Sequence, residues 1–311
     1  MSTLFFSHPD CRLHDMGAGH PECPQRLDAI SDHLIATGLD IMLQHEEAPL
    51  ATLAQLERAH STAYVLQLKD VLERVRDGGE PRALDPDTVA APGTWQAALR
   101  AAGAAVAATD EVIAGRARNA FCAVRPPGHH ATRDETMGFC FFNNVAVAAR
   151  HALDAHGLQR VAIIDFDVHH GNGTEDIVAG DERILMCSFF QHPLYPHSGA
   201  VPKGTNMINV PVAPYTRGPE LRQTLEAMWW PRLDDFRPQM VFISAGFDAH
   251  REDDLGQLGL VEADYEWMTR RLVEVAGRHA GGRIVSCLEG GYALSALARS
   301  VAAHVRVLAD A

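Results

Sequence analysis

Residues 161–174 read VAIIDFDVHHGNGT, and this stretch carries the strongest indication of how the chain folds. It begins as an apolar run with two isoleucines, which is typical of a strand buried on both faces. Asp167 and His169 follow two positions apart, so an extended backbone would point both side chains the same way. A carboxylate and an imidazole at the end of a strand form half of a divalent-metal site. The alternative is a solvated strand end with a polar turn.

The rest of the chain alternates short apolar runs with longer stretches of helical character. The predicted strands are residues 3–6, 121–124, 161–165, 184–188, 207–210, 240–244 and 284–288. The predicted helices are residues 24–36, 94–114, 145–156, 220–230, 263–278 and 294–308. Strands that alternate with helices indicate a parallel sheet covered on both faces. Since no linker or repeat divides the chain, we expect residues 1–311 to form a single α/β domain.

The composition favours a globular protein without nucleic-acid or membrane partners. The formal net charge is −13, from 27 basic and 40 acidic residues, whereas binding to nucleic acid needs a basic surface. No apolar run has membrane-spanning length, and the N-terminus lacks a signal-peptide pattern, so we expect a soluble, cytoplasmic protein. The six cysteines form no CxxC pair, and Cys122, Cys187 and Cys287 lie in apolar runs as expected of reduced core residues.

Four predicted strands lead into side chains that can bind a ligand or transfer a proton. These strands are residues 121–124, 161–165, 240–244 and 284–288, and the side chains after them are His129 and His130, Asp167 and His169, Asp248, and Tyr292. Ligands of parallel α/β sheets bind beyond the carboxyl ends of the strands. We therefore expect these side chains to meet at one edge of the sheet.

Asp167, His169 and Asp248 together make a set of two carboxylates and one imidazole. Three protein ligands leave one position for water, which is the pattern of catalytic zinc. His129 and His130 follow a stiff Pro-Pro-Gly turn, and because adjacent side chains diverge, we expect acid/base roles for them. The alternative for this pair is two histidines in a surface loop.

Tyr292 follows two glycines, which allow a sharp turn that could bring its phenol over the site. Its hydroxyl could then donate a hydrogen bond to a developing oxyanion. The alternative is an aromatic side chain packed at the start of a helix.

The motifs HPECPQR, RPPGHH, GFCFFNN, DFDVHHGNGT, SAGFDAH and LEGGY occur in this order between His20 and Tyr292. Together they resemble the motif set of the histone deacetylase family of zinc amidohydrolases, in its class II and bacterial deacetylase-like form. The resemblance covers nearly the whole chain. It implies the arginase–deacetylase fold, with a central parallel sheet, and hydrolysis of an N-acyl (acetyl) amide on an amine such as lysine.

The resemblance also implies a role for each residue that matches a family motif. Asp167, His169 and Asp248 resemble the zinc ligands, His129 and His130 the tandem catalytic histidines, and Tyr292 the catalytic tyrosine. Asp165 matches the carboxylate that orients His129, and Asn172 stands where class I relatives have aspartate. If Asn172 is the partner of His130, that imidazole lacks a carboxylate to raise its pKa and can act as a neutral base.

The resemblance places other residues along a substrate channel. Phe139, next to Gly138, resembles one aromatic wall, Tyr195 the opposite wall, and Asp87 a rim residue that holds the substrate backbone. Leu255 stands where polyamine-specific relatives have a glutamate gate. The family further implies a potassium ion near Asp165, Asp167, His169 and Ser188, and a catalytic ion that is zinc or, in the cell, Fe²⁺.

The sequence therefore predicts a zinc-dependent deacetylase for an acylated small amine or an acyl-lysine peptide. An acetylpolyamine amidohydrolase is the nearest alternative, although Leu255 disfavours it. A binuclear manganese hydrolase like arginase would need further ligating aspartates, and an acyl-lysine-binding pseudoenzyme would not need a general base. The sequence leaves the acyl-chain length and a homo-oligomeric state open.

Overall fold

Eight parallel strands form the central sheet of the computed structural model, which describes residues 2–310. Across the sheet they run in the order β2 (Leu43–Glu47), β1 (Thr3–Ser7), β5 (Asn119–Cys122), β10 (Ile284–Leu288), β9 (Val241–Ala245), β6 (Val161–Asp165), β7 (Ile184–Gln191) and β8 (Met207–Val212). Every adjacent pair is parallel. The four central strands are buried at every position, which explains why their sequences are nearly continuous apolar runs.

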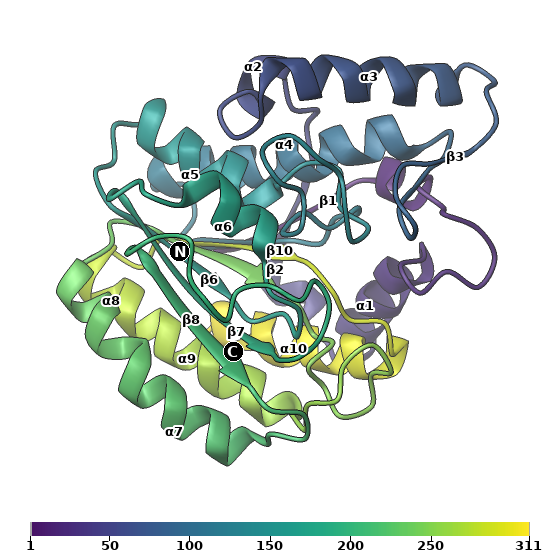
Figure 1. The fold of residues 1–311 in the computed structure, drawn as a ribbon. Helices are drawn as coiled ribbons and strands as arrows, with labels where there is room; N and C mark the ends of the chain where they lie inside the picture. The colour runs from purple at the N-terminus through teal and green to yellow at the C-terminus, as the bar shows by residue number, and fades with distance from the viewer. Residues whose placement is uncertain (1, 311) are drawn as a thin grey trace.

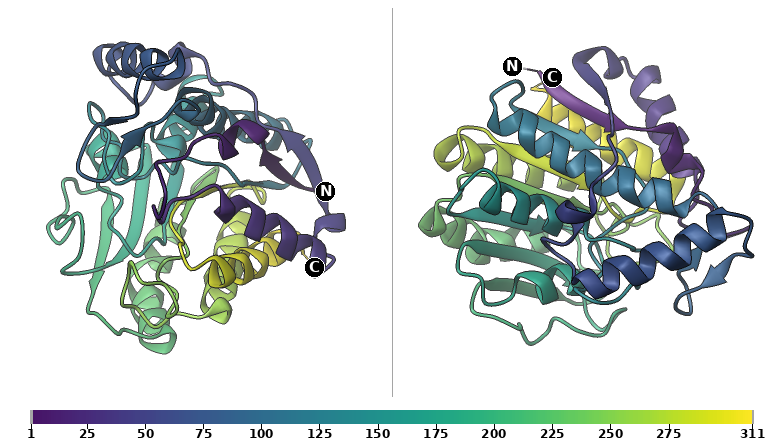
Figure 2. Two further views of the ribbon diagram at one scale, coloured as in Figure 1. Left: turned by 90° about the vertical axis from the view of Figure 1, so that its right-hand side faces the viewer. Right: turned by 90° about the horizontal axis from the view of Figure 1, so that it is seen from above.

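Helices cover both faces of this sheet and give three layers (Figures 1 and 2). One face carries α1 (Gln25–Ala36), α7 (Gly218–Met228), α8 (Trp230–Phe236), α9 (Glu262–His279) and α10 (Leu294–Leu308). The other carries α2 (Leu53–Leu56), α3 (Thr62–Arg76), α4 (Thr94–Ile113), α5 (Asn144–Asp154) and α6 (Asn172–Val178). Helix α4 is rich in alanine, which suits a helix packed closely against its neighbours. Among residues 2–310 no helix is both long enough and apolar enough to span a membrane.

Two 3₁₀ helices and a two-stranded hairpin complete the fold. The 3₁₀ helices η1 (Pro9–Arg12) and η2 (Asp40–Met42) contact α4 and α1, respectively. Strands β3 (Arg82–Ala83) and β4 (Val89–Ala90) pair antiparallel and form a small hairpin outside the main sheet.

All seven predicted strands and all six predicted helices are present; β6, β10 and α10 have the predicted ends, and the ends of the others are shifted. The predicted helix at 220–230 is wrong at its end, because α7 stops at Met228 and α8 begins at Trp230. Pro231 lies in the first turn of α8, where a proline starts a helix but cannot continue one from the preceding residues. The elements that the sequence analysis did not predict are β2, β3, β4, α2, α3, α6, α8, η1 and η2.

The order of the strands brings the predicted site together. Strands β5, β10, β9 and β6 are neighbours, and all four point the same way. Their carboxyl ends therefore open at one edge of the sheet, and the polar residues that follow them meet there.

Buried histidines help to fix the segments beneath this edge. The His60 ring donates from Nδ1 to the Thr132 carbonyl (2.9 Å) and accepts at Nε2 from the Asn143 N–H (2.9 Å), so it links the segment after the tandem histidines to the start of α5. Burial lowers the pKa of His60 to about 4, and burial lowers the pKa of His304 on α10 to about 3. Both rings are therefore neutral parts of the core.

Candidate active site

The segment after β6 is a series of tight turns. The strand ends at Asp165, so the expectation that Asp167 and His169 project from an extended backbone is wrong. The Asp167 N–H donates to the Asp165 Oδ1 (3.1 Å), and the His169 N–H donates to the Asp167 Oδ1 (2.9 Å). Each aspartate thus turns the backbone two residues onward, and these turns bring both side chains to the same side.

Asp167, His169 and Asp248 form a buried group whose potential ligand atoms all lie within 4.8 Å of one another. The His169 Nδ1 is 3.0 Å from the Asp167 Oδ1 and 3.1 Å from the Asp248 Oδ2. The second oxygen of each carboxylate is held by the backbone, because the Gly290 N–H donates to Asp167 (2.9 Å) and the Val168 N–H donates to Asp248 (2.9 Å). The three side chains are thereby oriented toward one point.

The charges of this group fit a divalent cation. Burial and the neighbouring Asp167 raise the pKa of Asp248 to about 7. Burial opposes the charged form of His169, but Asp167 and Asp248 outweigh burial and raise its pKa to about 10. A single proton on Nδ1 is therefore shared between two buried carboxylates. One nitrogen and two carboxylate oxygens suit zinc, and a divalent ion would balance both negative charges.

Residues 2–310 contain one other group with this kind of composition, formed by Asp110, His151 and His156. Both imidazoles donate from Nε2 to the Asp110 Oδ1, at 2.7 and 2.6 Å. The Arg58 guanidinium contacts the Nδ1 of His151. If His151 bound a metal through Nε2, its proton would lie on Nδ1 and would point at the Arg58 donor. The contacts therefore indicate a hydrogen-bonded cluster and not a metal site.

The tandem histidines lie beside the Asp167–His169–Asp248 group and have different hydrogen-bond partners. The His129 Nδ1 donates to the Asp165 Oδ2 (3.0 Å), whereas the His130 Nδ1 donates to the Asn172 Oδ1 (2.7 Å). Burial opposes the charged form of His129, but Asp167 and Asp165 outweigh burial and raise its pKa well above the usual value. Burial, then His129 and His169, lowers the pKa of His130 well below the usual value.

The two rings do not diverge as the sequence analysis expected. Their centroids are 4.0 Å apart, with planes inclined by 41°. The alternation of adjacent side chains holds for extended strands, and this segment is a turn. Gly138 leaves room for the pair, since a Cβ there would lie 2.4 Å from the His130 ring.

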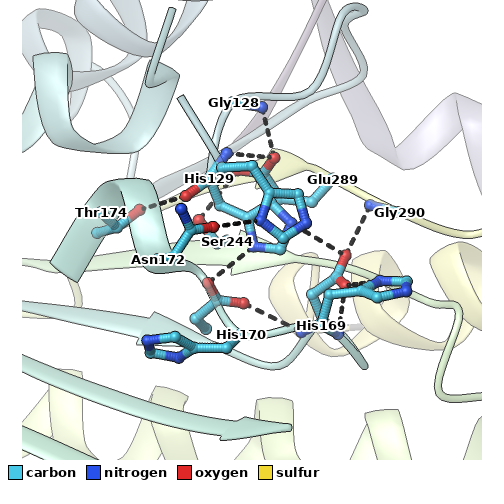
Figure 3. Close-up of polar contacts among 12 residues, drawn as sticks. Gly128, His129, His169, His170, Asn172, Thr174, Ser244, Glu289 and Gly290 are labelled. Atoms are coloured by element: carbon cyan, nitrogen blue, oxygen red, sulfur yellow. Dashed lines mark hydrogen bonds and ion pairs between the residues drawn. The ribbon is translucent and has the colours of Figure 1, made fainter. Parts of the chain in front are cut away.

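Glu289, in the LEGGY motif, fixes the backbone of the segment that carries the tandem histidines. Its Oε2 accepts from the backbone N–H groups of Gly128 (2.6 Å) and His129 (3.1 Å), and its Oε1 accepts from the Ser244 hydroxyl (3.0 Å; Figure 3). Burial raises its pKa to about 7. The sequence analysis missed this role, because an acid directly after a strand gives no sign of which backbone groups it will face.

Tyr292 lies over a buried arginine. The Arg26 guanidinium is 5.0 Å from the centre of the Tyr292 ring and donates to the carbonyls of Glu289 and Gly291. Burial and the charge of Asp248 raise the pKa of the Tyr292 phenol well above its usual value, so the hydroxyl stays protonated.

Arg26 belongs to a fully buried charge cluster that the sequence analysis did not assign. Glu22 accepts from Arg26 (3.0 Å) and makes a two-pronged contact with Arg125 of the RPPGHH motif. Burial opposes ionisation of Glu22, but Arg125 and Arg26 outweigh it and lower the pKa of Glu22 to about 2. Glu22 of the HPECPQR motif therefore anchors Arg26 beneath Tyr292.

The predicted channel residues surround the site to different extents. Phe139 packs against Tyr292 with ring centres 5.8 Å apart, and Tyr195 lies 5.2 Å from His130. Asp87 is half-buried on the loop whose Thr88 hydroxyl accepts from the Phe139 N–H (3.0 Å). Burial and the adjacent Asp85 raise the pKa of Asp87 to about 6. Leu255 is half-buried, and its N–H donates to Asp253 (3.1 Å).

Comparison with known proteins agrees with this geometry. A sequence model of the histone deacetylase domain matches residues 20–308. A histone deacetylase-like amidohydrolase of Pseudomonas aeruginosa is 39% identical over 282 residues, covering 88% of this chain and 73% of that protein. The mouse (Mus musculus) polyamine deacetylase HDAC10 is 35% identical over 322 residues, covering 99% of this chain and 46% of that protein.

A solved structure shares the fold as well. The crystal structure of the HDA15 HD domain superposes with a TM-score of 0.91 at 33% identity, covering 100% of this chain and 89% of that chain. The predicted arrangement, one α/β domain around a parallel sheet, is therefore confirmed. Since the family's sequence pattern and its fold both extend across nearly all of these residues, the chain belongs to the histone deacetylase family, whose members are deacetylase hydrolases.

Proposed function

We propose that this chain hydrolyses the N-acyl amide of a lysine side chain or a similar amine and releases acetate or another short carboxylate. The observation that carries the proposal is the unequal pairing of two adjacent histidines at the edge of the carboxylate–imidazole group. His129 is hydrogen-bonded to a carboxylate and His130 to an amide oxygen. One ring is thus held protonated and the other neutral, which is the combination that general acid–base hydrolysis needs.

Asp167, His169 and Asp248 would hold the zinc ion that the family generally uses. When bound, zinc lowers the pKa of water and polarises a carbonyl group. The same donors accept Fe²⁺, which is the alternative native metal.

The chain's own residues would then move the protons. His130 carries its proton on Nδ1, toward Asn172, so its Nε2 is free to accept a proton from the attacking water. The Tyr292 phenol donates a hydrogen bond to the oxygen that becomes negative as the carbonyl is attacked. His129 keeps its positive charge, and the proton taken up by His130 passes to the leaving amine.

Phe139 and Tyr195 would flank the acyl chain and the amine stem, and Asp87 would accept from the backbone of a peptide substrate. An acetylpolyamine is the alternative substrate, and the acidic Asp85 and Asp87 near Phe139 would also attract a cationic amine. Leu255 disfavours it, because an apolar side chain cannot pair with a second ammonium group.

We also propose a potassium site between β6 and β7. Asp165 and Ser188 are register partners in the sheet, and the buried Ser188 hydroxyl has no hydrogen-bond partner among residues 2–310. An unpaired oxygen beside a carboxylate suits a monovalent cation.

A panel of acyl amines tests the proposal, with acetate release from zinc-loaded protein as the readout. We expect turnover of an acetyl-lysine peptide to exceed that of acetylputrescine and acetylspermidine. Tyr292→Phe should lower the rate by about 10²–10³, the usual loss of one oxyanion donor. A Tyr292→Phe variant with near-native turnover would contradict the role of the phenol, and wild-type protein that releases no acetate from any substrate would contradict the function.

A further inference from the structure

The carboxylate of Asp253 joins the loop after β9 to the segment that leads into α10. Its Oδ2 accepts from the backbone N–H groups of Tyr292 (2.6 Å) and Ala293 (2.9 Å), and its Oδ1 accepts from the N–H of Leu255 (3.1 Å). The side chain is buried, with the residue only 5% exposed. No Lys or Arg of residues 2–310 forms an ion pair with it, so backbone donors alone stabilise its charge.

The segment that carries Tyr292 needs such an anchor. Gly290 and Gly291 precede Tyr292, and Gly291 has a φ of +122°, which leaves this backbone without a side-chain constraint of its own. Arg26 supports the Tyr292 ring from beneath and donates to the Gly291 carbonyl, on one side of the peptide bond that leads into Tyr292. The Asp253 carboxylate holds the N–H of that same peptide bond and the next N–H, so it fixes the Tyr292 backbone just before α10 begins.

Asp253 also lies five residues after Asp248, on the same loop. The Asp253 N–H donates to the His250 carbonyl (2.9 Å), which makes the stretch between the two aspartates a compact turn. A displacement of Tyr292 relative to the carboxylate–imidazole group is thus resisted through one short, rigid connection.

We propose that Asp253 is the positioning residue that holds the Tyr292 phenol at its working distance from the Asp167–His169–Asp248 group and fixes Leu255 beside it. This inference rests on the proposed function. It predicts that Asp253 acts on the rate of the chemical step through Tyr292 and has little effect on the binding of a short substrate.

Asp253→Asn is the first test, because an amide has the shape of the carboxylate but cannot accept from all three N–H groups. We expect kcat to fall about 10–100-fold while KM for an acetylated single lysine changes less than about threefold, since a misplacement of about 1 Å costs a rate of this order. The matched control is Asp254→Asn, an exposed neighbour with no hydrogen bond among residues 2–310, which should match the wild type.

A double-mutant cycle separates positioning from general support of the fold. In the Tyr292→Phe background Asp253→Asn should cause less than about a twofold further loss, because the group it positions is already gone. Deuterium exchange of residues 289–294 should speed up in Asp253→Asn, while exchange of residues 161–174 and the zinc content stay unchanged. A multiplicative loss in the double mutant, or full kcat in Asp253→Asn, would overturn the inference.

Asp253→Ser is measured in parallel, in case Asp253→Asn fails to fold. The serine hydroxyl can still accept one of the hydrogen bonds. The same cycle applies, and a loss that persists undiminished in the Tyr292→Phe background contradicts the inference. Failure of the proposed function has a different signature, since wild-type protein would then release no acetate or Tyr292→Phe would remain active.

Discussion

Replacing Gly290 by alanine is expected to weaken metal binding while the backbone stays in place. Gly290 is the residue whose N–H holds the Asp167 Oδ2, and its φ lies outside the left-handed region, so alanine can adopt the same conformation. A Cβ at this position would lie 2.1 Å from the Asp248 Oδ2 and 2.6 Å from the Asp167 Oδ2. The methyl group would therefore press on both carboxylates that we propose as ligands.

The overlap between the new methyl group and the Asp248 carboxylate determines how far zinc affinity should fall. An ordinary contact of a Cβ begins at 3.4 Å, so the Asp248 carboxylate must retreat by about 1.3 Å. Metal–ligand distances tolerate only about 0.2 Å. Changes in the residues that merely support metal ligands lower affinity about 10–100-fold, and this substitution moves the ligands themselves, so we expect zinc affinity to fall at least ~100-fold.

Competition against a chromophoric chelator measures zinc affinity directly and does not depend on activity. The matched control is Gly277→Ala in α9, where a Cβ would meet no atom within 4 Å. That variant should bind zinc like the wild type and gain stability of about 0.5–1 kcal/mol, the usual gain when alanine replaces glycine inside a helix. A folded Gly290→Ala protein whose zinc affinity is within threefold of the wild type would refute the assignment of Asp167 and Asp248 as ligands.

Three further predictions concern the buried groups around the site. Glu289→Ala should lower the free energy of unfolding by roughly 2–6 kcal/mol, because two backbone N–H groups lose their acceptor, whereas Glu289→Gln should lower it far less; urea titration distinguishes the two. The neutral, buried His60 and His304 bind protons only after unfolding, so each ring should lower stability by up to about 1.4 kcal/mol per pH unit as the pH drops from 6.5 toward 4, whereas the raised pKa values of Asp248 and Glu289 act in the opposite sense; the free energy of unfolding at pH 5 relative to pH 7 should therefore be higher in His304→Gln than in the wild type, and equal values from urea titration would contradict this. Glu22→Gln should lower the free energy of unfolding by about 3–5 kcal/mol, because it leaves the charge of Arg125 buried and unpaired, and a variant as stable as the wild type would exclude that pairing as a stabilising element.

The sequence predicted the central strands well because their burial on both faces leaves a strong signal. Strand β6 was predicted with its observed ends, and β10 likewise. Strand β2 was missed because it reads LQHEE and is exposed at four of its five positions, so its extended form depends on pairing with β1, which no local pattern shows. Helix α3 was missed although its apolar residues recur at helical spacing, so there the signal was present and overlooked.

The candidate site was predictable to the extent that its residues follow strand ends. The side chains of Asp167, His169 and Asp248 could be grouped from sequence because parallel strands end at a common edge. The contacts of Glu289 and Asp253 could not be predicted from the sequence. A carboxylate that accepts from backbone N–H groups looks there like one that binds a metal. Only the three-dimensional arrangement decides which donors face each oxygen.

The donors around each buried carboxylate distinguish the proposed metal ligands from the acids that only hold the backbone in place. Both oxygens of Glu289 and both of Asp253 accept from hydroxyl or backbone groups, so their charges are already stabilised by donors. Among residues 2–310 the Oδ2 of Asp248 has only the His169 imidazole as a hydrogen-bond partner, and the Oδ1 of Asp167 shares the same nitrogen while also accepting from the His169 N–H. One proton cannot neutralise two buried carboxylates that share it, so these two oxygens mark the position where the protein requires a further positive charge. The charges of Glu289 and Asp253 are stabilised by donors already in place, whereas Asp167 and Asp248 share one imidazole proton and need a further cation between them to remain ionised together.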